Sequence, residues 1–195
     1  MSPHRLEAFS DGVIAILITI MVLELKIPHG TSLGALRPLL PTGLIYLLSF
    51  ANLGIYWNNH HHMIQFTHRV DGTVLWANLH LLFWLSLIPV ATGWVGLNGF
   101  AKLPMAGYGV ILLFAGFAYY VLQSVIIRSQ GPDSKLRAAI GTDLKGKASP
   151  ILYLIGIAIS FADRWIALGV YVFVALMWLV PDRRLERAVQ IECQS

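Results

Sequence analysis

The chain has 195 residues, of which 56% are hydrophobic and 12% charged, and its mean hydropathy is +0.67. Soluble domains carry about 25% charged residues, so this composition excludes an ordinary water-soluble domain and indicates a protein that lies mostly within a bilayer. The formal net charge of +4 favours anionic lipid headgroups, rather than nucleic acid, as the partner of the basic residues. A single cysteine, Cys193, allows no disulfide within the chain.

A helix needs roughly 20 mostly apolar residues to cross a hydrocarbon core about 30 Å thick. Six segments meet or approach this requirement and predict an all-α membrane protein with six transmembrane helices in a single domain over residues 1–195. The fifth and sixth segments are separated by little more than Asp163 and Arg164, which predicts a tight helical hairpin, and Pro89 is expected to kink the third. In chain order the predicted spans are about 9–26, 39–58, 74–97, 105–127, 150–162 and 165–180.

Basic residues are unevenly divided between the two sides that six spans create. Because Lys and Arg accumulate on the cytoplasmic side of membrane proteins, the richer side and both chain termini are expected in the cytoplasm. Tryptophans near the span ends are typical of interfacial belts, and they are Trp57, Trp76, Trp94, Trp165 and Trp178. The richer side holds Arg5, Arg69, Arg128, Lys135, Arg137, Lys145, Lys147, Arg183, Arg184 and Arg187, and the other side holds Lys26, Arg37, Lys102 and Arg164.

Polar residues gather where the first span begins. Ser10 and Asp11 precede an apolar run, and an ionisable residue at membrane depth indicates a function by default. The alternative is that the Asp11 carboxylate only stabilises the positive end of a helix dipole. Asn78 and His80 in the third span, together with Asn52 in the second, are either ordinary hydrogen-bonded core residues or partners that lock the first helix to its neighbours.

The first span carries an apolar stripe with one hydroxyl. Ile16, Thr19, Ile20 and Leu23 stand at helical spacing and share a face. The face either packs against another helix, with Thr19 bonding back to a carbonyl one turn earlier, or it lines a pore, where apolar rings gate by excluding water and hydroxyls replace part of an ion's hydration shell. Periodicity does not choose between them.

No pattern in the sequence indicates an enzyme, a cofactor or a metal. The run NNHHHM at Asn58–Met63 is a poor metal site, because adjacent side chains on a helix diverge by about 100° and a zinc pair needs His at i and i+4. Gly107, Gly109 and Gly116 are expected to permit close helix packing rather than to bind a ligand.

The first span opens with R-x-x-x-F-S-D, at Arg5, Phe9, Ser10 and Asp11. This motif resembles the signature of the transmembrane protein 175 family of lysosomal potassium channels, in particular its bacterial single-repeat members. The resemblance extends over the whole chain, with one departure after Pro89, where VATGW replaces an expected second proline and phenylalanine. Further support comes from YWNNHHH at Tyr56–His62, from Asp71, from LWANLHLLFWLSLIPV at Leu75–Val90, and from the basic loop between the fourth and fifth spans.

The resemblance implies a passive potassium channel without a TVGYG filter, in a bacterial inner membrane, assembled as a homotetramer whose first helices line the pore. It places the narrowest constriction at Ile16, further apolar pore positions at Ile20 and Leu23, and a contribution to potassium preference at Thr19. It implies that the motif residues Arg5, Phe9, Ser10 and Asp11 anchor the first helix, and the polar partners inferred for them from residue type are His61, Asn78 and His80.

Two other functions remain open at this point. Asp11 and His80 could form the relay of a proton-linked secondary transporter, since carboxylates and histidines within spans often carry protons. The inverted repeats and broken midplane helices typical of transporters are not evident in the sequence. A non-conducting membrane scaffold built on the same helices is the third possibility.

Overall fold

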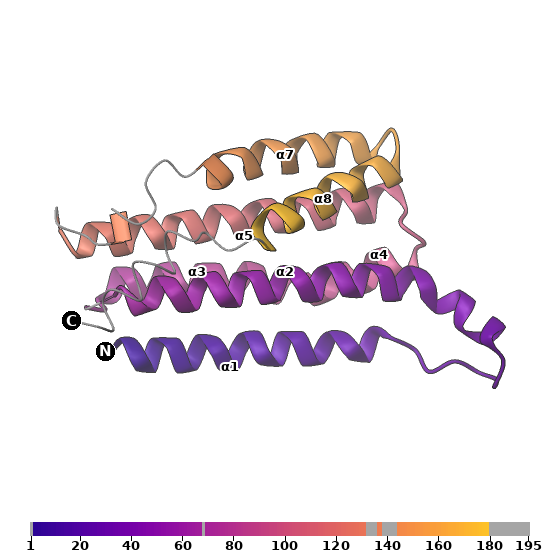
Figure 1. Ribbon diagram of the computed structural model, residues 1–195, viewed down its shortest axis with the longest axis horizontal. Coiled ribbons are helices and arrows are strands. Elements are labelled where there is room, and N and C mark those ends of the chain that lie inside the picture. The colour runs from indigo at the N-terminus through magenta and orange to yellow at the C-terminus, as the bar shows by residue number, and fades with distance from the viewer. Residues whose placement is uncertain (1, 68, 132–135, 138–143, 180–195) are drawn as a thin grey trace.

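The computed structural model describes residues 2–67, 69–131, 136–137 and 144–179 of the chain. The described part is a bundle of six helical rods that run along a common direction (Figure 1), which confirms the predicted all-α membrane architecture. Its helices are α1 (Pro3–Met21), α2 (Leu40–Gln65), α3 (Gly72–Ser86), α4 (Ile88–Leu97), α5 (Lys102–Ser129), α7 (Leu144–Ser160) and α8 (Arg164–Leu179), with the 3-10 turns η1 (Val22–Glu24) and η2 (Leu33–Leu39) between α1 and α2.

Four helical runs are long and apolar enough to cross a membrane: 3–24, 33–65, 72–97 and 102–129. α8 is a shorter apolar helix, and α7 starts at Leu144, before the predicted span at 150. Among the residues that entered the sequence predictions, Lys135, Val180, Arg183, Arg184, Arg187 and Cys193 lie outside the described residues.

The third rod is broken where proline interrupts it. Leu87 separates α3 from α4, and Pro89 occupies the first turn of α4. Proline has no backbone N–H, so Pro89 cannot form the hydrogen bond to the carbonyl one turn earlier that would continue α3. The Leu87 amide instead closes a tighter turn on the Trp84 carbonyl at 3.2 Å. The break therefore coincides with the kink predicted at Pro89.

The α7–α8 hairpin turns through a short link that is capped by its own aspartate. Asp163 Oδ1 accepts hydrogen bonds from the amides of Trp165, at 2.7 Å, and Ile166, at 3.2 Å. A carboxylate here accepts hydrogen bonds from amides that have no partner inside the helix. Its negative charge also interacts favourably with the positive end of the helix dipole. Arg164 ties the turn to the link between α4 and α5 by donating from Nη1 to the Gly99 carbonyl at 3.1 Å.

A buried tyrosine joins the hairpin to α5 at two glycines. Tyr171 of α8 is fully buried and donates its hydroxyl to the Met105 carbonyl of α5 at 3.2 Å. A side chain on Gly156 would place its Cβ 2.5 Å from Tyr171 Cε1, and one on Gly109 would lie 2.8 Å from Ile157 Cγ1. The close packing predicted for Gly109 is thus observed. The short distances between α5, α7 and α8 require that Gly109 and Gly156 have no side chain.

Replacing Gly156 with alanine is expected to destabilise the protein by about 1–3 kcal/mol, because the ring of Tyr171 has no free space into which it can move. The same change at Gly169, where nothing lies within 4 Å of an added Cβ, serves as the matched control and is expected to be neutral or slightly stabilising. Thermal melts of the detergent-solubilised variants measure both effects. Equal melting temperatures for the two variants would show that Tyr171 yields at no cost.

The basic residues of the described segments fall at opposite ends of the bundle. The beginning of α1, the ends of α2 and α5, and the beginnings of α3 and α7 all lie at the N-terminal end of α1 (Figure 1). This end carries Arg5, Arg69, Arg128, Arg137, Lys145 and Lys147, and the far end carries Lys26, Arg37, Lys102 and Arg164.

Candidate functional site

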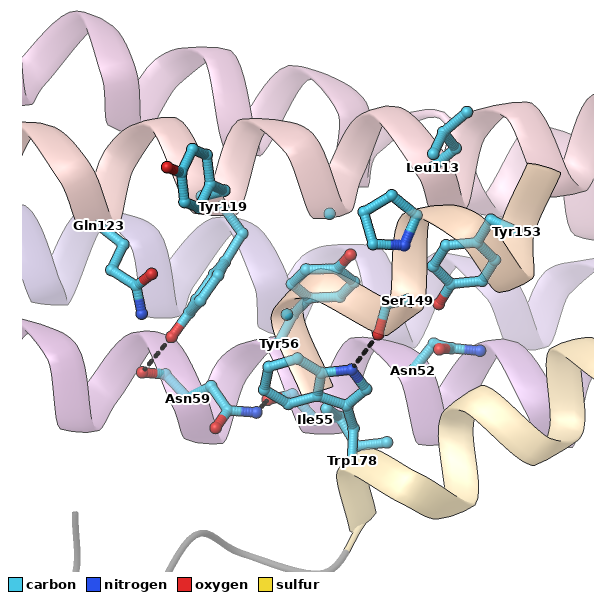
Figure 2. Close-up of a pocket in the computed structure, with 14 residues that line it drawn as sticks. Asn52, Ile55, Tyr56, Asn59, Leu113, Tyr119, Gln123, Ser149, Tyr153 and Trp178 are labelled. Atoms are coloured by element: carbon cyan, nitrogen blue, oxygen red, sulfur yellow. Dashed lines mark hydrogen bonds between the residues drawn. The ribbon is translucent and has the colours of Figure 1, made fainter. Parts of the chain in front are cut away.

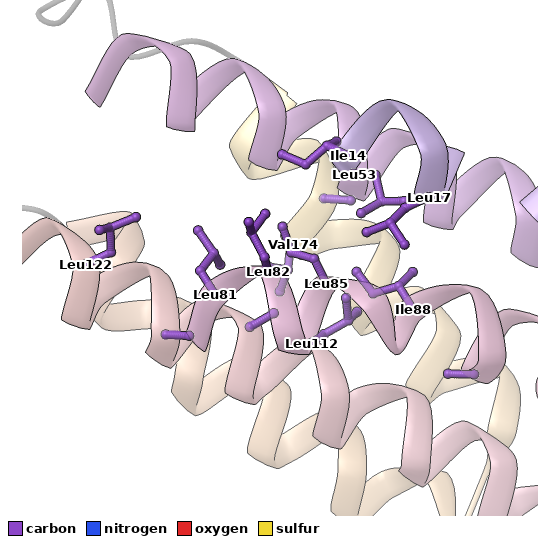
Figure 3. Packing of buried hydrophobic residues seen from close by; sticks show 14 of the residues in the cluster. Ile14, Leu17, Leu53, Leu81, Leu82, Leu85, Ile88, Leu112, Leu122 and Val174 are labelled. Atoms are coloured by element: carbon purple, nitrogen blue, oxygen red, sulfur yellow. The ribbon is translucent and has the colours of Figure 1, made fainter. Parts of the chain in front are cut away.

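α1 has one face packed in the bundle and one face turned away from it. Leu6, Ser10, Ile14, Leu17 and Met21 are buried. Ile14 and Leu17 point toward the α3–α4 rod, where Leu85 and Ile88 are fully buried (Figure 3). The spacing of three and four residues between these positions keeps them on one side of the helix.

The opposite face of α1, continued by η1, carries the predicted stripe. The exposed fraction is 57% for Ile16, 44% for Ile20 and 77% for Leu23, and Thr19 is also exposed. Phe9, from the opening motif, lies on this outward face with 51% exposed. None of these apolar side chains is buried by the described part of the chain, so the stripe faces either lipid or another molecule.

Thr19 makes the local hydrogen bond that β-hydroxyl side chains make on helices. Its Oγ1 donates to the Ile16 carbonyl at 2.9 Å. The hydroxyl proton is thereby engaged within the helix, so the oxygen lone pairs remain outside. A hydroxyl oxygen so oriented can accept a hydrogen bond from water or contact a cation.

Three buried polar side chains connect the inner face of α1 to α2 and α3. Asn78 Nδ2 donates to Ser10 Oγ at 3.0 Å, and Asn78 Oδ1 is 2.8 Å from His60 Nε2. Ser10 in turn donates to the Leu6 carbonyl at 2.9 Å, and all three residues are fully buried. Asn78 therefore uses both ends of its amide to bridge α1 and α2 from α3.

A second set of contacts lies nearer the bundle end. Asp11 Oδ1 accepts from Trp57 Nε1 at 3.0 Å, and the Glu7 carboxylate is 2.7 Å from His61 Nδ1. The rings of Trp57 and His61 stack with centroids 6.3 Å apart, and His61 Nε2 is 2.8 Å from Gln65 Nε2. These contacts fasten the first turns of α1 to the last turns of α2.

Two of the three predicted polar partners contact α1. Asn78 bonds to the motif residue Ser10, in agreement with the prediction, whereas His61 bonds to Glu7, which is not a motif residue. His80 accepts from Trp84 Nε1 of its own helix at 3.0 Å, because it lies about 200° around α3 from Asn78 and faces away from α1. Asp11 and His80 are therefore not joined in a direct relay of the kind considered for a transporter.

Two other residues considered in the sequence analysis form none of the side-chain hydrogen bonds described above between α1 and its neighbours. Asn52 donates to the Leu48 carbonyl of α2 at 3.0 Å, so it is a core residue bonded within its own helix. Arg5 is exposed and forms no ion pair within the described part of the chain.

Sequence reasoning missed Glu7, Trp57 and His60. Trp57 was assigned to an interfacial belt, yet its indole nitrogen bonds to Asp11. A signal was present, since Glu7 stands one turn before Asp11 while Trp57 and His61 are spaced by one turn on α2, so two polar pairs can form side by side.

The segment VATGW, which departs from the expected pattern, fits α4 against its neighbours. Thr92 Oγ1 lies 2.7 Å from Ser49 Oγ of α2, which is 3.0 Å from the Tyr108 hydroxyl of α5. Beside it, the absence of a side chain at Gly93 leaves room for the carboxylate of Glu24. The departure therefore contributes Thr92 to a buried hydroxyl cluster and leaves space for Glu24 of η1.

The adjacent histidines point toward different helices. His60 contacts Asn78 of α3, and His61 contacts Glu7 of α1. Among residues 2–67, 69–131, 136–137 and 144–179, no group of three or more His, Cys, Asp or Glu side chains is placed to hold a metal ion.

Comparison with known proteins gives a consistent result. The sequence model of the family described as endosomal/lysosomal potassium channel TMEM175 matches residues 5–89. A potassium channel from Chryseobacterium sp. is 55% identical over 190 residues, which cover 97% of this chain and 99% of that protein. The chain belongs to the TMEM175 family. It is a multi-pass membrane protein, and its relatives are named as ion channels rather than enzymes.

More distant members of the TMEM175 family share the fold and part of the sequence. The crystal structure of a lysosomal potassium-selective channel TMEM175 homolog from Chamaesiphon minutus superposes with a TM-score of 0.81 at 28% identity, over 92% of this chain and 97% of that one. The endosomal/lysosomal proton channel TMEM175 of Gallus gallus is 31% identical over 103 residues, and the match covers 47% of this chain and 21% of that protein.

Proposed function

We propose that this chain is the subunit of a passive potassium channel in the inner membrane of a bacterium, with both termini in the cytoplasm. Four copies assemble around an axis as a homotetramer. The α1 helix of each copy lines the pore, and no TVGYG-type filter takes part. The names of the bacterial relatives, which are potassium channels, support the choice of ion.

The observation that carries the proposal is the uncovered stripe on α1. Ile16 and Ile20 stand on the outward face of α1, whose other face is packed in the bundle, and Leu23 of η1 continues the stripe. Several copies of α1 around an axis would bring these side chains together and leave the rest of each bundle outside. The stripe then has a partner in the assembly that it lacks in one chain.

The chemistry of the stripe suits a pore that gates by excluding water. A ring of Ile16 side chains forms the narrowest constriction, and Ile20 and Leu23 extend the apolar wall. Apolar constrictions of this kind resist ion passage by dewetting. Thr19, whose proton is engaged by the Ile16 carbonyl at 2.9 Å, presents oxygen lone pairs that replace part of the hydration shell of a passing K⁺.

Hydrogen bonds on the inner face of α1 hold this pore-lining helix against α2 and α3. The opening motif contributes Ser10, bonded to Asn78, and Asp11, bonded to Trp57. Side-chain hydrogen bonds between helices fix rotation as well as position, since a helix that turned about its axis would leave these groups without partners. The stripe is thereby kept on the pore axis.

The basic end of the bundle supports the orientation. The N-terminal end of α1 carries Arg5, Arg69, Arg128, Arg137, Lys145 and Lys147 within the described residues. Retention of Lys and Arg in the cytoplasm would place this end, and the N-terminus with it, on the inner side of the membrane.

Gradient-driven potassium efflux from proteoliposomes of purified protein tests the proposed function. Passive efflux that follows the potassium gradient and is independent of a proton gradient is the expected result. Efflux that stops when the proton gradient is removed would instead favour the transporter. No efflux from folded, oligomeric protein would leave the scaffold as the function.

Replacing Thr19 with alanine is expected to lower the preference for potassium over sodium several-fold, because the hydroxyl oxygen that contacts the ion is lost. Thr19→Val, which keeps the shape of the side chain, should have the same effect. Reversal potentials in mixed potassium and sodium gradients measure the change. Thr31→Val, in the exposed link before η2, is the matched control. Reversal potentials that are the same in Thr19→Ala, Thr19→Val and Thr31→Val as in the unmodified protein would exclude a selectivity role for Thr19.

A further inference from the structure

A cleft lies between α2, α5, α7 and α8, and no described residue of α1, α3 or α4 lines it (Figure 2). The space between these helices, counted together with its open mouth, is about 640 Å³, and ligand sites in proteins are commonly concave and largely apolar with a few polar groups. Its walls are rich in aromatic side chains, and these are Tyr56, Tyr119, Tyr120, Tyr153 and Trp178. The cleft is separate from the stripe on α1.

Several hydrogen-bonding groups in the cleft have no partner among the described residues. Two polar groups are engaged, since Trp178 donates to Ser149 at 2.8 Å and Tyr119 donates to the Asn59 carbonyl at 3.3 Å. Within the described part of the chain, no hydrogen bond involves the hydroxyls of Tyr56 and Tyr153 or the amide of Gln123, all of which line the cleft (Figure 2). Unpaired polar groups at membrane depth are costly, so these three require water or a ligand.

The described lining disfavours a charged ligand. None of its residues is Asp, Glu, Lys or Arg, and an ion that lost its water there without a counter-charge would be strongly disfavoured. Hydroxyls and amides both donate and accept, which suits hydroxyl and ester groups. The aromatic and aliphatic walls suit an apolar body.

The depth of the cleft indicates where its ligand comes from. Asn59 and Gln123 lie about 9 Å along the helix axis from the ends of α2 at Gln65 and of α5 at Ser129, at 1.5 Å per residue. The headgroup layer of a bilayer is about 5–8 Å thick on each side. With the helix ends at the bilayer surface, the outer end of the cleft lies at the level of the lipid esters and the first acyl carbons, and the cleft extends deeper to Asn52 and Leu113.

We propose that this cleft binds a neutral acylglycerol from the adjacent leaflet. Its glycerol hydroxyls and ester bond to Gln123, Tyr56 and Tyr153, and its acyl chain lies along the aromatic wall. The bound lipid would fill the space between the α7–α8 hairpin and the α2–α5 pair. This inference does not depend on the proposed function, because it concerns binding and not conduction.

The test is photolabelling of the full chain in nanodiscs with a monoacylglycerol that carries a diazirine in its acyl chain. Saturable labelling of α5 and α7 peptides, with competition by monooleoylglycerol, is the expected result. Competitors with the same chain but a carboxylate or a trimethylammonium headgroup should be at least tenfold weaker. Better competition by either charged analogue would overturn the proposal, and non-saturable labelling would show that the cleft holds only water.

Variants locate the labelling. A Cβ on Gly116 lies 3.7 Å from the Tyr56 hydroxyl oxygen, so Gly116→Leu should fill the cleft and abolish saturable labelling. Gly169→Leu on α8, where an added Cβ meets nothing within 4 Å, is the matched control and should label normally. Should Gly116→Leu fail to fold, Tyr153→Phe and Gln123→Leu decide, with affinity expected to fall roughly three- to tenfold for each lost hydrogen bond. Unchanged affinity in both would overturn the proposal.

Discussion

Ile16→Asn is expected to raise passive potassium flux through proteoliposomes on the order of tenfold. In the proposed pore, the ring of Ile16 side chains is the constriction that resists wetting, and 57% of each side chain is exposed on the outward face of α1. A polar amide at this position retains water in the constriction and lowers the barrier to the ion. Tenfold corresponds to about 1.4 kcal/mol of barrier height.

The matched control is Ile151→Asn on α7, at the opposite edge of the bundle from α1 (Figure 1). Ile151 has a similar exposed fraction, 60%, but lies off the proposed pore. Its flux is expected to equal that of the unmodified protein at equal amounts of reconstituted oligomer. Equal flux in both variants would mean that Ile16 does not limit conduction, and a rise in both would indicate a general leak caused by asparagine in a lipid-facing position.

Asn78→Leu is expected to have the largest effect on stability among the polar substitutions. The change keeps approximately the same side-chain volume but removes the amide to which both Ser10 and His60 bond at the centre of the α1–α2–α3 contact. His60 Nε2 then loses its partner, and Ser10 keeps only its bond to the Leu6 carbonyl. Together these losses cost about 2–4 kcal/mol. For a chain of this length, that corresponds to a melting temperature lowered by roughly 5–15 °C.

Asn98→Leu provides the control, because Asn98 is exposed at the end of α4 and donates only to the Trp94 carbonyl of its own helix, at 2.8 Å. Its melting temperature should stay within about 2 °C of the unmodified protein, as is usual for surface changes. Comparable losses in both variants, measured by thermal unfolding in detergent, would show that the Asn78 bridge contributes no more than an exposed local bond.

The helical architecture was predictable because each membrane crossing requires its own apolar segment. The grouping of the stripe residues on one face was also predictable, since residues at spacings of three and four share one side of any helix. Thus Ile16, Thr19, Ile20 and Leu23 fall together in the structure. What periodicity left open was which side of the helix meets the bundle.

The hydrogen-bond partners could not be predicted in the same way. One residue along a helix is a rotation of about 100°, so the rotation of α3 decides whether Asn78 meets Ser10 or Asp11. Packing of helices against one another sets that rotation, and it turned His80 back onto Trp84. The cleft was likewise hidden, because its lining comes from four helices that are far apart in the chain.

Cadmium block of an introduced cysteine tests most directly whether the outward face of α1 lines a pore. In a Cys193→Ser background, Leu23→Cys would place a thiol at a position that is 77% exposed in η1, directly after α1, and Leu154→Cys would place one at a position 56% exposed on α7. Thiolates bind soft metal ions tightly. The account predicts that cadmium blocks potassium flux through Leu23→Cys and leaves Leu154→Cys unaffected. Flux through Leu23→Cys that persists in cadmium, with the thiol shown to be reactive, would contradict it.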